Sequence, residues 1–379
     1  MMKRKLTARE IVAVASLLFG LFFGAGNLIF PVHMGQMAGA NSVVAILGFI
    51  VTAVGLPLLA IVSMALSRSE SLAELSGRVG KHYGIFFTCL LYLTIGPCFA
   101  IPRCASTSFT VGMAPLVGED QQALALLIFS TIFFALVLYF SLRPSGILTY
   151  VGKVINPVFL VFLLLLIIAA LLNPTAGLTE VAPEGNYVNH PFVTGFLEGY
   201  NTMDILAALA FGITIVQVIK ELGVEKPQDV AGATYRAGLF SSLLMAVIYA
   251  LITLMGVFSR GVFATSENGG IALTQIAHHY FGSAGQLILA ATVTLACLKT
   301  SIGLVTSCAE TFGLLFPKVS YKTWTVLFSV FPLVVSNFGL TQIISLSLPV
   351  LMFLYPLAIT LILLTVFGKF YGNDRKIYV

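Results

Sequence analysis

The sequence predicts an all-helical integral membrane protein, built as one bundle from two halves of opposite orientation. Of its 379 residues, 58% are hydrophobic and 9% are charged, and the mean hydropathy is +1.01. A soluble protein carries about 25% charged residues, so the composition indicates a polytopic membrane protein. The apolar residues gather in ten segments, and two of these are interrupted near their middle by small and polar residues. Such interruptions are tolerated in a bilayer only where the freed backbone is buried in protein or lines a cavity.

The ten apolar segments are close to the length that a membrane-spanning helix needs. A bilayer core of about 30 Å takes about 20 helical residues. The ninth and tenth segments are separated only by a turn at Asn337–Gly339. We expect a single transmembrane domain over 1–379, with a short surface helix in the loop 67–83. The segments are placed at 8–35, 42–66, 84–112, 122–141, 150–172, 192–219, 236–258, 284–314, 322–337 and 339–367.

The lysines and arginines predict the orientation of the chain. With the N-terminus in the cytoplasm, 17 of the 20 fall in cytoplasmic segments, Arg260 lies outside, and Arg103 and Lys299 lie within spans. This distribution follows the positive-inside rule. The cytoplasmic residues are Lys3, Arg4, Lys5, Arg9, Arg68, Arg78, Lys81, Arg143, Lys153, Lys220, Lys226, Arg236, Lys318, Lys322, Lys369, Arg375 and Lys376.

The first interruption lies in Phe22–Pro31, which reads F-F-G-A-G-N-L-I-F-P. Gly24 and Gly26 each cost roughly 1 kcal/mol in a helix interior. Asn27 brings a polar amide to the same depth, and Pro31 lacks the backbone donor of a regular helix. We therefore predict that a small solute or an ion binds here.

The second interruption lies in segment 192–219, at G-Y-N-T (199–202), between Glu198 and Asp204. The two glycine breaks are 175 positions apart (199 − 24). Five segments precede the midpoint and five follow it, so the second half must be inverted, with repeats over about 8–172 and 192–367. Paired broken helices in inverted halves indicate a transporter with a site at the membrane midplane.

The ends of interrupted helices have a chemistry that suits a zwitterion. Free N–H groups with a partial positive charge favour a carboxylate, and free carbonyl groups favour an ammonium group or a bare cation such as Na⁺. An amino acid matches both kinds of end. Asp204 is expected to orient the second break, carry a proton or pair with a cation, since ionisable residues inside a membrane are functional by default.

Several motifs make the sequence similar to a known family. They are G-A-G-N-L-I-F-P (24–31), P-R-C-A-S-T-S-F (102–109), G-Y-N-T-M-D (199–204), A-C-L-K-T-S-I-G-L (296–304), C-A-E-T-F (308–312) and V-S-N-F-G-L-T-Q (335–342). The chain resembles the bacterial branched-chain amino acid carriers, which are cation-coupled symporters for leucine, isoleucine and valine. The resemblance implies a five-plus-five, leucine-transporter-like fold in the bacterial inner membrane. Family members usually have twelve spans, so we expect this chain to lack the last two.

The resemblance also implies which residues bind the substrate and the coupling ion. Residues 24–27 would form the first unwound stretch, and residues 199–202 would form the second. The sodium ion would lie between the first and eighth spans, where hydroxyl and carbonyl oxygens are suitable ligands for a hard cation. The implied substrate residues are Gly24, Ala25, Gly26, Asn27, Gly199, Tyr200, Asn201, Thr202 and Asp204. The implied sodium ligands are the Thr300 and Ser301 hydroxyls and the carbonyls of Cys297, Gly20 and Phe23.

Two alternatives to sodium-coupled uptake of these amino acids stay open. The ammonium group of Lys299 could replace sodium electrostatically and make the carrier H⁺-coupled or ion-independent, although position 299 points about 100° away from position 300 around a helix. A carrier of the same fold could also take another small solute. In a simpler interpretation, the small residues allow close helix packing, and the hydroxyls bond back to their own helix.

Other function classes lack their sequence signatures. There is no H-E-x-x-H, no G-x-S-x-G and no G-x-x-x-x-G-K-S/T motif, so we expect neither an enzyme nor a primary pump. The five cysteines form no C-x-x-C pair and no loop cluster, so no disulfide, metal site or cofactor is expected beyond the coupling ion. A net charge of +5 spread in this way indicates membrane lipid, not nucleic acid, as the partner. Arg103 is expected to neutralise an internal acid and not to bind substrate.

Overall fold

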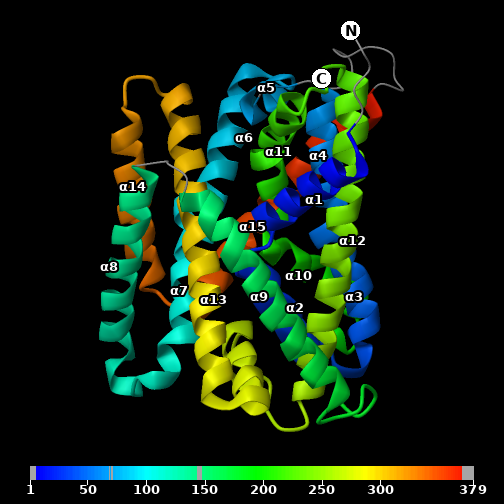
Figure 1. Cartoon of the computed structure of the whole chain (residues 1–379), viewed down its shortest axis with the longest axis vertical. Coiled ribbons are helices and arrows are strands. Elements are labelled where there is room, and N and C mark those ends of the chain that lie inside the picture. The colour runs from blue at the N-terminus through cyan, green and yellow to red at the C-terminus, as the bar shows by residue number, and fades with distance from the viewer. Residues whose placement is uncertain (1–5, 68, 70, 143–146, 369–379) are drawn as a thin grey trace.

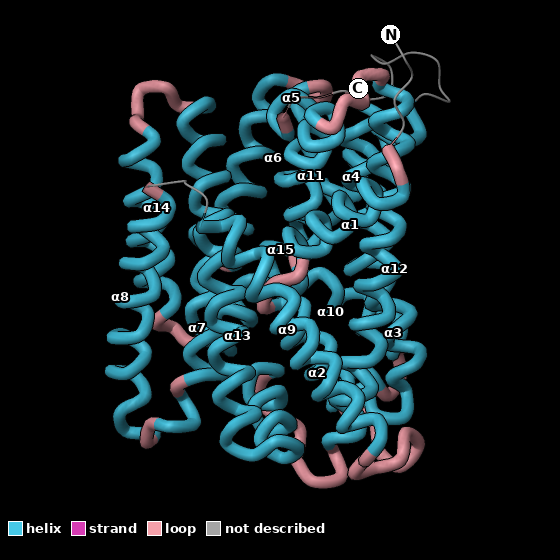
Figure 2. Tube along the Cα trace, viewed as in Figure 1, coloured by secondary structure: helices cyan, strands magenta, loops and turns pink. Residues whose placement is uncertain are grey.

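The computed structural model is a bundle of helices with no strand among the residues that it describes, which are 6–67, 69, 71–142 and 147–368 (Figures 1 and 2). Short 3₁₀ and π turns connect or interrupt the helices. The helices are α1 Ala8–Phe22, α2 Gly26–Ala38, α3 Ser42–Ile50, α4 Leu56–Ser67, α5 Leu72–Gly77, α6 Lys81–Leu93, α7 Ala100–Gly112, α8 Gln122–Ser141, α9 Ile147–Leu172, α10 Pro191–Glu198, α11 Asp204–Glu221, α12 Pro227–Ser259, α13 Gly269–Leu315, α14 Tyr321–Ser336 and α15 Leu340–Phe367.

Six helical stretches of the described chain are long and apolar enough to cross a membrane. Leu160–Leu172 and Tyr321–Ser336 are apolar but shorter, and the predicted total of ten spans stays a prediction. The six stretches are Gly26–Ser67, Lys81–Leu116, Glu119–Ser141, Gln228–Ser259, Gly269–Leu315 and Leu340–Phe367. The predicted cytoplasmic cations that lie outside the described residues are Lys3, Arg4, Lys5, Arg68, Arg143, Lys369, Arg375 and Lys376.

Two predicted connections are confirmed. The turn between the ninth and tenth segments is formed by three residues between α14 and α15, and Gly339 takes a φ of 84° there, which favours glycine. The loop 67–83 contains the short helix α5, whose N-cap Ser71 accepts a hydrogen bond from the Glu74 main-chain N–H at 3.1 Å. In Figure 1, α5 lies at the same end of the bundle as the start of α12.

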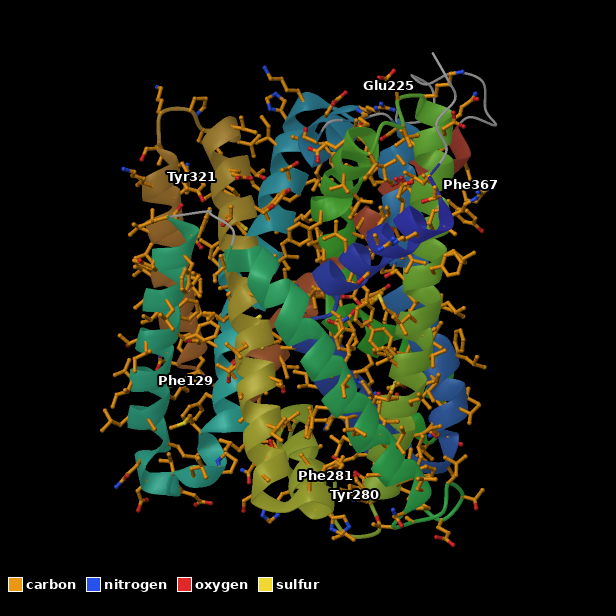
Figure 3. The ribbon with its side chains drawn as sticks, in the orientation of Figure 1. Phe129, Glu225, Tyr280, Phe281, Tyr321 and Phe367 are labelled. Carbon is orange, nitrogen blue, oxygen red and sulfur yellow. The ribbon has the colours of Figure 1, made fainter. Side chains whose placement is uncertain are left out.

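A further stretch of helix precedes the eighth segment, whose predicted start at residue 284 lies close to a backbone break at Gly282. Helix α13 starts at Gly269, because the Asn268 side chain caps the first turn by accepting from the Gly270 and Ile271 N–H groups. The backbone turns at Gly282, where φ is 61°, before the long part of the helix continues. Figure 3 places Tyr280 and Phe281 of this first part at the end of the bundle opposite Glu225.

The first interrupted helix packs along α12. Both α1 and α2 contact α12, and the contact with α2 is backbone to backbone. A side-chain carbon at Gly35 would collide with the Thr253 carbonyl group, and one at Gly256 would collide with the Val32 carbonyl group. Small residues of this kind allow membrane helices to approach closely.

The second interrupted helix packs in the same way on the other half of the chain. Helices α10 and α11 contact α3 and α4. A side-chain carbon at Gly48 would collide with the Phe192 carbonyl group, and one at Gly195 would collide with the Ala45 carbonyl group. The first interrupted helix thus packs on α12, in the second half of the chain, and the second packs on α3 and α4, in the first half. This reciprocal packing is expected from an inverted repeat.

The remaining helices form a second group beside this one. Helix α13 packs against α7, α9 and α14, and α8 packs against α14. Figure 1 shows α8 and α14 at one edge of the molecule and α12 near the opposite edge. Helix α15 contacts α4, α7 and the turn between α10 and α11, so it lies where the two groups meet.

Candidate functional site

The first break is three residues long. Helix α1 ends at Phe22, and Phe23 is extended, with φ −73° and ψ 95°. The Gly24 main-chain N–H donates to Asn27 Oδ1 at 2.8 Å. Through this bond the Asn27 side chain reaches back to the break. The predicted unwound stretch is corrected, since Gly26 and Asn27 lie in the first turn of α2 and only 23–25 leave the helix.

The second break is a turn and a reversal, not an unwound strand. Residues 199–202 form one 3₁₀ turn, in which the Thr202 hydroxyl donates to the Gly199 carbonyl oxygen at 2.9 Å. Met203 follows with a φ of 62° and is the one non-glycine residue with positive φ in the described chain. Such a conformation is unfavourable for a bulky side chain and persists only where the surroundings impose it. Helix α11 then starts at Asp204.

The two breaks are joined by a buried polar cluster. Asn27 Nδ2 donates to Asp204 Oδ1 at 2.9 Å and to Oδ2 at 2.8 Å. Tyr249 of α12 donates its hydroxyl proton to Asp204 Oδ2 at 2.8 Å and also bonds to the Asn27 amide. The exposed fractions are 2% for Asn27, 2% for Asp204 and 0% for Tyr249. A carboxylate at this depth is tolerated because several donors compensate its lost hydration.

Arg103 of α7 reaches both breaks. Its Nη1 donates to the Asn201 main-chain carbonyl oxygen at 2.6 Å, and its guanidinium group lies 5.0 Å from the centroid of the Phe30 ring. A side-chain carbon at Gly26 would lie 2.8 Å from Arg103 Nη2. Asp204 is near enough to interact with it electrostatically, but the hydrogen bond goes to a carbonyl group. Sequence reasoning missed this contact, because nothing in the spacing of residues 103 and 201 links them.

Two predicted substrate residues have structural partners. A side-chain carbon at Gly199 would collide with the Thr52 hydroxyl group, which donates to the Phe196 carbonyl oxygen at 2.8 Å and so satisfies the end of α10. The Tyr200 ring stacks on Tyr355 of α15, with centroids 4.0 Å apart. These contacts hold the second break against α15 and against the π turn Val51–Gly55, which follows α3.

The predicted sodium ligands lie on α13, in the last turn of α1 and in the first break. The Thr300 side chain faces the first break, since a side-chain carbon at Gly24 would lie 3.8 Å from its Oγ1. Its hydroxyl group donates to the Ala296 carbonyl oxygen at 3.0 Å. Ser301 is fully buried, and its Oγ has no hydrogen-bond partner among the described residues. Cys297 is also fully buried, Gly20 lies in the last turn of α1, and Phe23 is the first residue of the break.

A cavity of about 660 Å³ lies beside this centre and not between the two breaks. It is bounded by α7, α8, the first part of α13 and the turn between α14 and α15. None of the predicted substrate residues lines it. Its lining includes Ser106, Phe109, Glu267, Asn268, Gln275 and Phe338.

Solved structures of the same architecture support the fold. The chain is similar to Mhp1, a nucleobase-cation-symport-1 family transporter, with a TM-score of 0.64 and 18% identity, over 97% of this chain and 81% of that one. It is also similar to MhsT, solved in complex with L-phenylalanine, with a TM-score of 0.63 and 14% identity, over 100% of this chain and 93% of that one. The leucine-transporter-like fold predicted from the sequence is therefore confirmed.

Curated relatives are closer in sequence. The chain is 52% identical to the branched-chain amino acid permease BrnQ of Lactobacillus delbrueckii subsp. lactis and 44% identical to BrnQ of Bacillus subtilis, in each case over 100% of this chain and 85% of the relative. It is 41% identical to the branched-chain amino acid transport system 2 carrier protein of Pseudomonas aeruginosa, over 98% of this chain and 83% of that carrier. These relatives are permeases or carriers, so the prediction of a membrane transporter that is not an enzyme is confirmed.

The family match covers almost the whole chain. Residues 7–379 match the family described as branched-chain amino acid transport protein. This range includes both helix breaks, the cluster that joins them and the arginine between them. The chain therefore belongs to the branched-chain amino acid transport protein family.

Proposed function

We propose that the protein imports leucine, isoleucine and valine across the bacterial inner membrane, with its N-terminus in the cytoplasm. The observation that carries this proposal is the bond between Asn27 and Asp204, which joins two helix breaks in a chain whose relatives are named for branched-chain amino acids. Paired breaks at the centre of such a bundle are where transporters bind their substrates.

The amino acid would lie between the two breaks. The start of α2 offers N–H groups and a partial positive charge to the substrate carboxylate, and the carbonyl groups at the end of α10 suit the ammonium group. Asp204 would hold the second break in place and contribute negative charge on the ammonium side. The proposed substrate residues are Gly24, Ala25, Gly26, Asn27, Gly199, Tyr200, Asn201, Thr202 and Asp204.

We place the coupling ion, Na⁺, between α1 and α13. The position of Thr300 against Gly24 and the unpartnered buried hydroxyl group of Ser301 support this choice. The Cys297, Gly20 and Phe23 carbonyl groups would complete the ligand set. An ion here would hold the first break against α13, so ion and substrate should each raise the affinity for the other.

Uptake into proteoliposomes tests both parts of the proposal. Labelled isoleucine should accumulate, and valine should compete while alanine and uracil should not. At saturating leucine and a fixed membrane potential, removal of Na⁺ should reduce the rate at least tenfold. Equal rates with and without Na⁺ would remove the sodium site and favour H⁺ coupling.

A carrier for another small solute of similar size is the second candidate. It is favoured by one observation, the structural similarity to a transporter of the nucleobase-cation-symport-1 family. The same uptake assay separates the two candidates, because competition by uracil alone would support this one.

A further inference from the structure

We propose that Arg103 binds the carboxylate group of the transported substrate, through the edge of its guanidinium group that carries Nε and Nη2. This inference rests on the proposed function and names the residue that recognises one end of the substrate. It differs from the expectation that Arg103 only neutralises an internal acid.

The Arg103 guanidinium group is buried, and only part of its hydrogen-bonding capacity is used. Arg103 is 4% exposed, and the one hydrogen bond that its guanidinium group makes to the described residues is from Nη1 to the Asn201 carbonyl oxygen. Nε and Nη2 have no hydrogen bond to any residue of the described chain. A buried arginine with unused donors is costly, so a partner that accepts from that edge would stabilise it.

The Asp204 carboxylate does not occupy the edge of Arg103 that carries Nε and Nη2. Both Asp204 oxygens accept hydrogen bonds from Asn27 and Tyr249. No ion pair joins Arg103 to Asp204 within the described residues. A planar edge with two parallel N–H groups matches a carboxylate, which accepts both bonds at once.

The Arg103 guanidinium group is held in place by residues of the second break and of α2, without a substrate. Nη1 is fixed by the Asn201 carbonyl group of the second break, and the Phe30 ring of α2 supports the guanidinium group at 5.0 Å. Gly26, the first residue of α2, lets Nη2 lie against the main chain at the start of α2, since a side-chain carbon at Gly26 would be only 2.8 Å from it. A carboxylate bound there would also lie at the positive end of α2, so the two attractions would act on the same group.

The test compares leucine with leucinol, in which a hydroxymethyl group replaces the carboxylate. The full chain is purified into nanodiscs, and each apparent Kd is read from the rise in Tm with ligand concentration, which needs no tracer. Wild type should bind leucine at least 100-fold more tightly than leucinol. Arg103→Gln should weaken leucine binding about 30-fold or more, leave leucinol within threefold, and so remove most of the preference.

Two further variants keep the test decisive if Arg103→Gln does not fold. Gly26→Ala retains the arginine but places a carbon 2.8 Å from Nη2, so it should also reduce the preference for leucine. Arg236→Gln makes the same exchange on an exposed part of α12 and should change neither Kd.

Three outcomes separate the possibilities. Loss of the leucine preference in the Arg103 or Gly26 variant supports the assignment. An equal loss of leucine and leucinol affinity overturns it, because Arg103 would then only position the Asn201 carbonyl group. Absence of any leucine effect on the Tm of the wild type overturns the proposed function itself, and the assignment with it.

Discussion

Asn27 and Asp204 are 177 positions apart in the chain, yet the amide of one donates to both carboxylate oxygens of the other, at 2.9 and 2.8 Å. The two residues lie in the first turns of α2 and α11, directly after the two breaks. A change in the angle at either break must therefore move or stretch these bonds. The pair couples the two interrupted helices, and through Tyr249 it couples both to α12.

The first prediction concerns this pair. Asp204→Asn places an amide donor against the Asn27 donor and removes a buried charge, so uptake should fall at least tenfold while the protein still inserts. Asn27→Ala should have a similar effect, because it leaves the carboxylate with fewer donors. Exchanging the two residues, Asn27→Asp with Asp204→Asn, restores an acceptor opposite a donor and should recover part of the activity. Isoleucine uptake checks all three, and normal uptake by Asn27→Ala would contradict the prediction.

The second prediction concerns the close contact of α2 with α12. Gly256→Ala introduces a collision with the Val32 carbonyl group, so it should lower the free energy of unfolding by about 1–3 kcal/mol, the usual cost of overpacking. Gly232→Ala is the matched control in the same helix, because a carbon there meets nothing within 4 Å. It should stabilise slightly through helix propensity. Thermal unfolding in detergent measures both, and equal Tm values would argue against the backbone contact.

The third prediction concerns the coupling ion. Thr300→Val removes the hydroxyl group that faces the first break but keeps the shape, so the Na⁺ concentration for half-maximal uptake should rise at least tenfold. Thr292→Val serves as the control, since Thr292 also bonds to carbonyl groups of α13 but lies more than two turns away. An unchanged Na⁺ dependence in Thr300→Val would exclude this hydroxyl as a ligand.

The fourth prediction concerns the start of α13. Asn268 caps the helix and its Nδ2 also donates to the Thr341 hydroxyl group of α15 at 3.0 Å. Asn268→Ala should lower the free energy of unfolding by about 1–3 kcal/mol, from the lost cap and the lost bond. Ser320→Ala removes a cap and a bond to the Thr323 hydroxyl group, both within the first turn of α14, and should cost less. If the two variants unfold at the same temperature, the bond to α15 contributes nothing.

The sequence was most informative where it broke a local rule. Glycine, asparagine and proline inside an apolar run are unfavourable unless a site requires them, so the breaks at Gly24 and Gly199 could be predicted. The short turn at Gly339 could be predicted for the same reason. In each case a few neighbouring residues determine the backbone.

Contacts between distant residues could not be predicted in this way. Tyr249 is one aromatic residue in a long apolar helix, and no periodicity distinguishes it from a packing residue. The bond from Arg103 to the Asn201 carbonyl group depends on how α7 meets the second break, which a single sequence does not contain. The positive φ of Met203 is likewise imposed by tertiary structure, since its own propensity opposes it.

The extent of the breaks also depended on side-chain geometry. Asn27 was expected to belong to the unwound stretch, but it lies in the first turn of α2, and its Oδ1 accepts from the Gly24 N–H. The substrate and ion assignments themselves stay predictions, which the uptake and binding experiments above test.

The glycine pairs between α2 and α12 and between α3 and α10 limit how this protein can move. Where the main chains touch, neither helix can slide or rotate without steric overlap, so we expect each helix pair to move as one rigid unit. Bending of the two interrupted helices is then concentrated at two hinges, residues 23–25 and residues 199–203. Changes in lipid fluidity or bilayer thickness should therefore have little effect on these two helix pairs. A single added methyl group at residues 23–25 or 199–203 should instead lower the rate of the whole transport cycle.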